Sequence, residues 1–181
     1  MCGIAGIVDL RGRPVAVAAV RRLCEGLVHR GPDDEGYHVD GPVALGQRRL
    51  AILDLAGGRQ PMSNEAGTVW ITCNGEIYNF RELRERLEGL GHRFATQSDT
   101  EAIVHAYEQY GPACVQELRG MFAFALWDQP KQTLLLARDR VGKKPLCYAE
   151  VDGQWVFASE LQALLRHPGV PRDVDRAALD D

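Results

Sequence analysis

The chain has 181 residues, of which 45% are hydrophobic and 25% charged, values that are ordinary for one globular domain with a real core. A net charge of −4 and a pI near 5.7 argue against a dedicated surface for nucleic acid or anionic membrane. No apolar run is long enough for a transmembrane helix and the start lacks the layout of a signal peptide, so we expect a cytoplasmic protein.

The first part of the chain predicts more strands than helices. Apolar residues at helical spacing predict one amphipathic helix at residues 15–29, which the loop chemistry of residues 30–36 ends. The predicted strands are residues 4–9, 43–45, 50–53 and 69–73.

The second part predicts two helices and then a run of strands. Asn79 and Ser98 are the expected starts of the helices, and Gly91 and Gly111 their ends. A leucine-rich strand at 133–137 is expected to be buried on both faces. The other predicted elements are strands 121–127, 146–150 and 155–158, a short helix at 159–165, and a linker or tail at 168–181.

The order of these elements predicts the fold class. Helices grouped between runs of strands indicate an α+β fold with antiparallel hairpins, because a parallel sheet would need regular βαβ alternation. Two sheets between helical layers suit this order.

The cysteines favour neither a disulfide framework nor a zinc knuckle, because their number is odd and no two have C-x-x-C spacing. They are Cys2, Cys24, Cys73, Cys114 and Cys147. Cys24 falls on the apolar stripe of the first predicted helix, which indicates a small buried side chain. Only Cys2 has a distinctive position.

Cys2 becomes the N-terminal residue if Met1 is removed, a cut that a small residue at position two permits. A thiol with a pKa near 8.5 and an α-amine with a pKa near 7.7–8.0 then share one residue. The amine can accept the thiol proton, directly or through water, which makes Cys2 a candidate nucleophile with its own base. The alternative is a small residue that merely follows the start.

Asn74-Gly75 comes directly after the predicted strand 69–73. A side-chain amide and an unobstructed backbone N–H there could stabilise the oxyanion that Cys2 chemistry would create. Asn-Gly is also the commonest pair in hairpin turns, so a plain turn is the alternative.

Arg49 and Asp99 are candidates for binding the charged end of an amino acid. A strand would hold the Arg49 guanidinium, whose planar fork suits a carboxylate. Asp99 at the start of a helix could bind an ammonium group, or could simply cap that helix. A solvated side chain or an ordinary structural ion pair is the alternative for Arg49.

The sequence predicts no metal or phosphate site. The five histidines have no metal-ligand spacing, and the acidic residues 33–35 are interpreted as a solvated loop. Residues 142–144 lack the glycine spacing of a phosphate loop. His29 could serve as a base for a cysteine, but support of the loop after the first helix is the favoured interpretation.

Several longer motifs occur in a fixed order along the chain. They are Met1–Ile4, HRGPD at 29–33, Arg49-Leu50, NGEIYN at 74–79, SDTE at 98–101, GMFAFA at 120–125, RDR-x-G at 138–142, Pro145-Leu146 and ASE at 158–160. Over residues 1–167 the chain thereby resembles the N-terminal glutaminase domain of glutamine-hydrolysing asparagine synthetases, which are class II glutamine amidotransferases. Cys147 stands where that family usually has tyrosine.

The resemblance implies an N-terminal-nucleophile hydrolase fold, a four-layer αββα sandwich with two antiparallel sheets. It implies that Cys2 attacks the side-chain amide of L-glutamine, releases ammonia and forms a γ-glutamyl thioester that water hydrolyses. By resemblance, Asn74 and Gly75 form the oxyanion hole, Arg49 binds the substrate α-carboxylate and Asp99 its α-ammonium. The residues implied to line the glutamine pocket are Leu50, Ile52, Leu53 and Glu76.

Members of that family continue into an ATP-dependent synthetase domain, which residues 168–181 would approach. ATP and Mg²⁺ are expected only there, and no cofactor is expected in residues 1–167. The implied partners are L-glutamine and a synthetase domain in cis or trans, with a homodimer as a further possibility.

Two other functions stay open at this point. One is a glutamine-sensing or docking module, and the other is a free-standing amidase that acts on another amide. The set of Cys2, Asn74 and Gly75 favours an enzyme, since binding alone does not require it. The pair of Arg49 and Asp99 favours a free amino acid as substrate.

Overall fold

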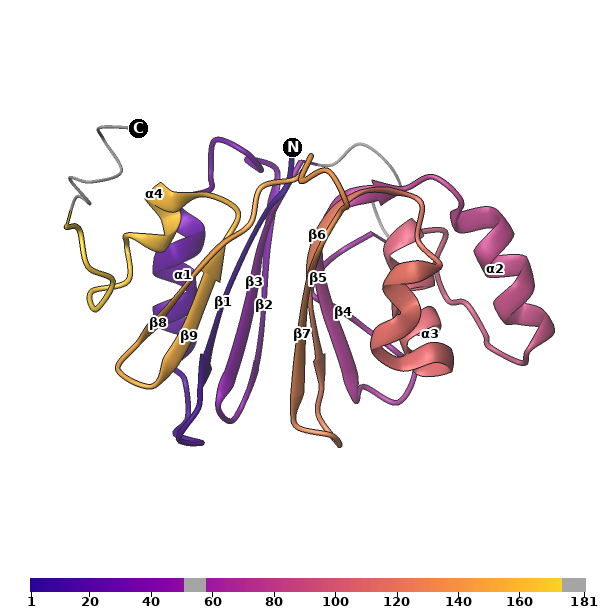
Figure 1. Cartoon of the computed structure of the whole chain (residues 1–181), viewed down its shortest axis with the longest axis horizontal. Helices are drawn as coiled ribbons and strands as arrows, with labels where there is room; N and C mark the ends of the chain where they lie inside the picture. Colours follow the sequence, from indigo (N-terminus) through magenta and orange to yellow (C-terminus); the bar gives the residue numbers. More distant parts are fainter. Residues whose placement is uncertain (51–57, 174–181) are drawn as a thin grey trace.

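The computed structural model describes residues 1–50 and 58–173. Two antiparallel sheets lie face to face with helices on both outer sides, so the layers run helix, sheet, sheet, helix (Figure 1). The predicted α+β sandwich with two antiparallel sheets is therefore confirmed. In the part of the chain that the structure describes, no helix has both the length and the apolar character needed to span a bilayer.

The first sheet has five strands in the order β2-β3-β1-β9-β8. Its strands are β1 (Gly3–Asp9), β2 (Asp34–Asp40), β3 (Val43–Arg49), β8 (Cys147–Val151) and β9 (Gln154–Ala158). Helices α1 (Val17–Glu25) and α4 (Leu161–Leu164) cover its outer face (Figure 1). The first sheet thus joins the first and the last described strands, since β1 pairs with β9.

The second sheet has four strands in the order β4-β5-β6-β7. Its strands are β4 (Met62–Ser63), β5 (Val69–Ile77), β6 (Gly120–Asp128) and β7 (Thr133–Arg138). The helices α2 (Phe80–Gly89) and α3 (Asp99–Tyr110) lie on its outer face, followed by the 3-10 helix η1 (Gly111–Gln116).

Three apolar clusters hold the four layers together. One lies between the first sheet and its helices, and the predicted burial of Cys24 is confirmed there. A second lies between the other sheet and α3, where Ile103 and Phe124 are fully buried. The third joins the two sheets through Leu45, Trp127 and Phe157. Burial of apolar area on this scale is the main stabilising term of such a domain.

Two expectations differ from the structure, and a third lies mostly outside the described residues. Asp34 and Glu35 begin strand β2 instead of a solvated loop, because Glu35 pairs with Arg48 on β3. Strand β7 is an edge strand with half-buried side chains, so the expected burial on both faces is wrong. Of the strand predicted at 50–53, Leu50 lies outside β3 and the rest is outside the described residues.

The packed unit reaches beyond the predicted boundary at residue 167. Val170 is buried in the cluster of the first sheet. The division into residues 1–167 and 168–181 stays a prediction.

Candidate active site

A cavity of about 260 Å³ lies at the end of the sandwich that carries the N-terminus. The ends of β3 and β5 and the start of α3 contribute to its lining. Seven of the predicted site residues lie around it, namely Cys2, Arg49, Leu50, Asn74, Gly75, Glu76 and Asp99. Ile52 and Leu53 lie outside the described residues.

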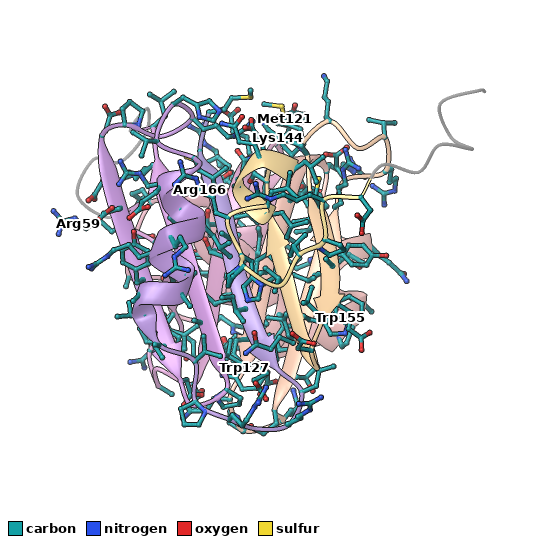
Figure 2. The ribbon with its side chains drawn as sticks, turned by 90° about the vertical axis from the view of Figure 1, so that its left-hand side faces the viewer. Arg59, Met121, Trp127, Lys144, Trp155 and Arg166 are labelled. Atoms are coloured by element: carbon teal, nitrogen blue, oxygen red, sulfur yellow. The ribbon has the colours of Figure 1, made fainter. Side chains whose placement is uncertain are left out.

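A larger cavity, of about 510 Å³, is lined mainly by apolar side chains such as Trp127, Leu134 and Trp155. Trp127 and Trp155 lie at the lower end of the molecule in Figure 2, whereas Lys144 lies at the upper end. The larger cavity contains none of the predicted catalytic groups, so the smaller one is the candidate active site.

Cys2 precedes strand β1, and its thiol donates a weak hydrogen bond to the carbonyl oxygen of Leu50, with 3.8 Å between sulfur and oxygen. Buried Arg30 fixes the backbone at this point, because its Nε donates to the Cys2 carbonyl oxygen at 2.9 Å. Arg30 in turn forms an ion pair with Glu160 at 2.5 Å, which lowers the pKa of the Glu160 carboxyl. His29 also contacts Glu160, at 2.9 Å, so its nearest partner is this carboxylate and not Cys2.

Met1 is present in this structure and occupies the mouth of the cavity. Its sulfur lies 3.7 Å from the Lys144 ammonium and 3.9 Å from the Arg30 guanidinium. Removal of Met1 would free the α-amine of Cys2 at the cavity that Lys144 also lines.

Lys144 was not among the predicted site residues, although its side chain is buried and lines the cavity. Its loop is anchored by Asp139, whose carboxylate accepts backbone N–H groups from Phe122, Val141, Lys143 and Lys144. Burial opposes ionisation of Asp139, but these hydrogen bonds prevail and lower the pKa of its carboxyl. The RDR-x-G motif thus has a structural explanation that periodicity alone did not reveal.

Asn74 lies inside strand β5, opposite Ala123 of β6, so the alternative of an Asn-Gly hairpin turn is wrong. Its side chain is 1% exposed, and its Nδ2 has no hydrogen-bond partner among the described residues. A buried N–H₂ group without a partner costs free energy, and such groups in native proteins call for an explanation. The missing partner is explained if Nδ2 of Asn74 donates its hydrogen bond to an oxygen of the substrate.

Gly75 lines the same cavity, and the strand pairing sets the direction of its backbone N–H. Phe122, opposite Gly75, uses both its N–H and its carbonyl oxygen on Asp139, so these two strand residues form a non-hydrogen-bonded pair. The N–H of Gly75 must therefore point away from β6. Its neighbours with the same orientation, Cys73 and Ile77, donate to Gln60 and Asp99 respectively.

A glycine is also required at position 75 for a steric reason. A Cβ atom there would lie 2.3 Å from the carbonyl oxygen of Met121 and 2.6 Å from Cα of Phe122. The close approach of β6 therefore excludes any side chain at this position, independently of chemistry.

Arg49 is the last residue of β3, and its side chain is buried at the cavity. Asp99 begins α3, but the cap is Ser98, whose hydroxyl accepts from the N–H of Thr100. The Asp99 carboxylate instead accepts the N–H of Ile77 at 2.7 Å. Burial raises the pKa of the Asp99 carboxyl, and a bound ammonium group would offset that cost.

We expect Asp99→Asn to weaken glutamine binding by roughly 10- to 100-fold, the effect of losing a charge-assisted hydrogen bond. Asparagine can still accept the Ile77 N–H, so the thermal stability should change little. Since the folded-state pKa of Asp99 is raised, the wild-type KM should rise as pH falls through that pKa, at a higher pH than for an ordinary aspartate. Steady-state kinetics between pH 4 and pH 8, taken here as roughly the range in which carboxyls titrate, would measure this. An unchanged KM in the variant would contradict the role.

Three of the other four cysteines are poorly suited to nucleophilic attack, because they are buried. Burial raises the pKa of the Cys24 thiol to about 12 and that of Cys114 to about 11. Cys73 lines the cavity, but burial raises its thiol pKa well above the usual range. A thiol attacks as its thiolate, so these cysteines are held in the unreactive form.

Two antiparallel sheets between helical layers, with a cysteine at the head of the first strand, define an N-terminal-nucleophile hydrolase fold. The solved structure titled glutamine phosphoribosylpyrophosphate amidotransferase from B. subtilis, complexed with ADP and GMP, shares the fold of this chain. It superposes with a TM-score of 0.77 at 23% identity, over 93% of this chain and 44% of that one.

The sequence comparisons identify the family. Residues 1–181 match the model of the glutamine amidotransferase domain, and the chain belongs to this family. It is 44% identical to asparagine synthetase [glutamine-hydrolyzing] 2 of Bacillus subtilis, over 100% of this chain and 24% of that protein. It is 43% identical to asparagine synthetase [glutamine-hydrolyzing] 2 of Arabidopsis thaliana, over 91% of this chain and 28% of that protein. The chain thus spans about a quarter of the length of these relatives.

Proposed function

We propose that this chain hydrolyses the side-chain amide of L-glutamine to glutamate and ammonia. The observation that carries the proposal is the pair of donors at Asn74 and Gly75, held on the same cavity as Cys2. A buried donor such as Asn74 Nδ2, which has no hydrogen-bond partner among the described residues, is suited to a charge that appears only during reaction.

In the proposed reaction the Cys2 sulfur attacks the amide carbon after its proton passes to the Cys2 α-amine. The carbonyl oxygen gains negative charge, which Asn74 Nδ2 and the Gly75 N–H stabilise. The amine then protonates the departing nitrogen, ammonia leaves, and a γ-glutamyl thioester remains. Water activated by the same amine hydrolyses the thioester to glutamate and restores the thiol. Arg49 and Asp99 hold the α-carboxylate and α-ammonium of the substrate.

We further propose that the ammonia serves ATP-dependent asparagine synthesis by a synthetase domain in cis or trans. The support is the name of the relatives, of which this chain spans about a quarter. ATP and Mg²⁺ belong to that synthetase domain in the proposal. A homodimer and a cytoplasmic location stay predictions.

The test combines intact-mass measurement with a glutaminase assay. Protein that has lost the mass of one methionine should convert L-glutamine to glutamate and ammonia in equal amounts, whereas protein that keeps Met1 should be inactive. D-glutamine is the control substrate. Its α-carboxylate and α-ammonium are arranged in the opposite sense, so they cannot reach Arg49 and Asp99 while the side-chain amide lies at Cys2. Processed protein that binds L-glutamine without hydrolysing it would favour a sensing module instead.

A further inference from the structure

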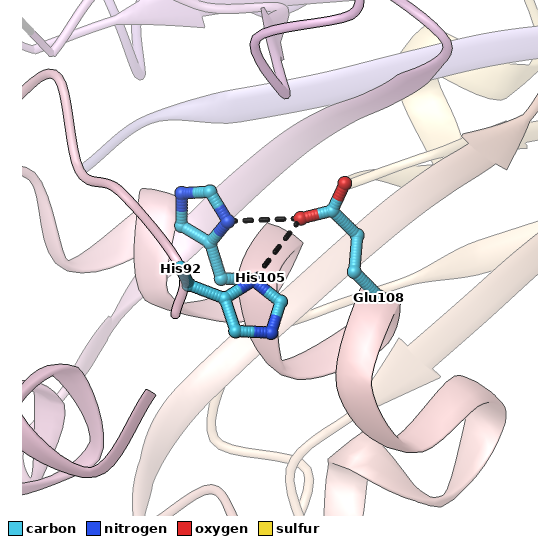
Figure 3. A group of neighbouring side chains, drawn as sticks. All are labelled: His92, His105 and Glu108. Atoms are coloured by element: carbon cyan, nitrogen blue, oxygen red, sulfur yellow. Dashed lines mark hydrogen bonds and ion pairs between the residues drawn. The ribbon is translucent and has the colours of Figure 1, made fainter. Parts of the chain in front are cut away.

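Three side chains converge on the outer layer of the second sheet, away from both cavities. His92 follows α2, while His105 and Glu108 lie one turn apart on α3. Glu108 Oε2 lies 2.9 Å from His105 Nδ1 and 3.6 Å from His92 Nδ1 (Figure 3). These three atoms all lie within 4.8 Å of one another, which is close enough to hold a single ion.

In two of these side chains, Glu108 and His92, the second polar atom already has a hydrogen-bond partner outside the group. Asn64 Nδ2 donates to Glu108 Oε1 at 2.8 Å, and this leaves Oε2 for the centre of the group. His92 Nε2 lies 3.1 Å from Gln109 Oε1, and in the tautomer in which Nε2 donates to this oxygen, Nδ1 has a lone pair. In that tautomer the lone pair faces Glu108 Oε2 at 3.6 Å, and two acceptors at this distance repel each other unless a proton or a metal ion lies between them.

The second ring nitrogen of His105, Nε2, also faces a carboxylate without a hydrogen bond. Its side chain is 1% exposed, and its buried Nε2 has no hydrogen-bond partner. If Nδ1 donates to Glu108, Nε2 is left as an acceptor facing Glu101 Oε1 at 3.6 Å. A metal ion on Nδ1 would place the proton on Nε2, where Glu101 can accept it. That arrangement of metal, imidazole and carboxylate is common in metal sites.

We propose that His92, His105 and Glu108 form a structural zinc site. Two imidazole nitrogens and one carboxylate oxygen are a ligand set that Zn²⁺ accepts, with metal–ligand distances of about 2.0–2.2 Å. Tetrahedral ligands at those distances are about 3.3–3.6 Å apart, and the observed separations of 2.9 and 3.6 Å bracket this range. Water completes the fourth position, which the partial exposure of His92 and Glu108 allows.

The ion would act as a brace and not as a catalyst, because neither described cavity is lined by these residues. It would tie the segment after α2 to the middle of α3, the helix that begins with Asp99. Binding lowers the free energy of the folded state alone, so the domain should become more stable as Zn²⁺ is added.

The test is a Zn²⁺ titration of chelator-treated protein, carried out in Cys2→Ser protein so that the N-terminal thiol cannot bind the ion. We expect one Zn²⁺ per chain in competition with a chromophoric chelator, and a thermal midpoint that rises with Zn²⁺ concentration. His92→Gln should weaken binding by more than about 100-fold, and Gln109→Ala, which removes a supporting acceptor, by about 10-fold. Co²⁺ in place of Zn²⁺ should give the intense visible absorption of a tetrahedral site.

His167→Gln is the matched control, since it removes an imidazole outside the group and should leave both stoichiometry and affinity unchanged. His92 is partly exposed, and circular dichroism of His92→Gln without metal checks that the variant folds. Equal Zn²⁺ affinity of His92→Gln and His167→Gln would overturn the proposal. So would the absence of stoichiometric binding, which would make the group a proton-sharing network. Neither result depends on whether the chain hydrolyses glutamine.

Discussion

Cys2→Ala is expected to abolish glutamine hydrolysis, with a fall in kcat of several orders of magnitude, while glutamine binding persists. Alanine at position two still permits removal of Met1, so the variant keeps the α-amine and loses only the sulfur. The cavity keeps Arg49 and Asp99, which we propose bind the α-groups of the substrate. Coupled glutamate detection measures turnover, and isothermal titration calorimetry measures the retained affinity.

Cys147→Ala is the matched control for this experiment. Cys147 is a partly exposed cysteine at the start of β8, and it does not line the candidate active site. Its replacement should leave kcat unchanged. Equal turnover by Cys2→Ala and the wild type would remove Cys2 from the mechanism.

Asn74→Ala is expected to lower kcat by about 10²- to 10³-fold, which corresponds to about 2.7–4 kcal/mol of lost oxyanion stabilisation. Nδ2 of Asn74 donates to no described residue, so its removal should cost little stability and could increase it. The combination of lower kcat with an unchanged or higher thermal midpoint distinguishes a catalytic donor from a structural one.

Asn79→Ala provides the opposite pattern. The Asn79 side chain donates to the Glu117 carbonyl oxygen and accepts from the Arg119 N–H, both at 2.9 Å, and it lies outside the cavity lining. We expect a lower thermal midpoint with an unchanged kcat. A drop in kcat for Asn79→Ala as large as for Asn74→Ala would argue that the loss is indirect.

Local sequence patterns predicted most helices and strands, but they predicted strand pairing and burial less well. A helix lies within the predicted range 15–29, although it ends at Glu25, and the hairpin near the C-terminus is present. Both follow from periodicity and turn residues, which act within a few residues. Strand β2 was missed, since its pairing depends on Arg48 of a neighbouring strand. Strand β5 continues through Asn74-Gly75 because β6 pairs along its whole length, which overrides the turn preference of that dipeptide.

The sequence by itself determined the candidate nucleophile and the family motifs, since both depend on the identity and order of residues. Only the tertiary structure decided that Nδ2 of Asn74 stays without a partner, that the Gly75 N–H points away from β6, and that Lys144 lies beside the N-terminus. It also decided that His92 meets Glu108, although a histidine and a glutamate three residues apart on a helix were a visible hint. The direction of an N–H and the burial of a charge depend on contacts between strands that are far apart in sequence. Local residue spacing does not predict those contacts.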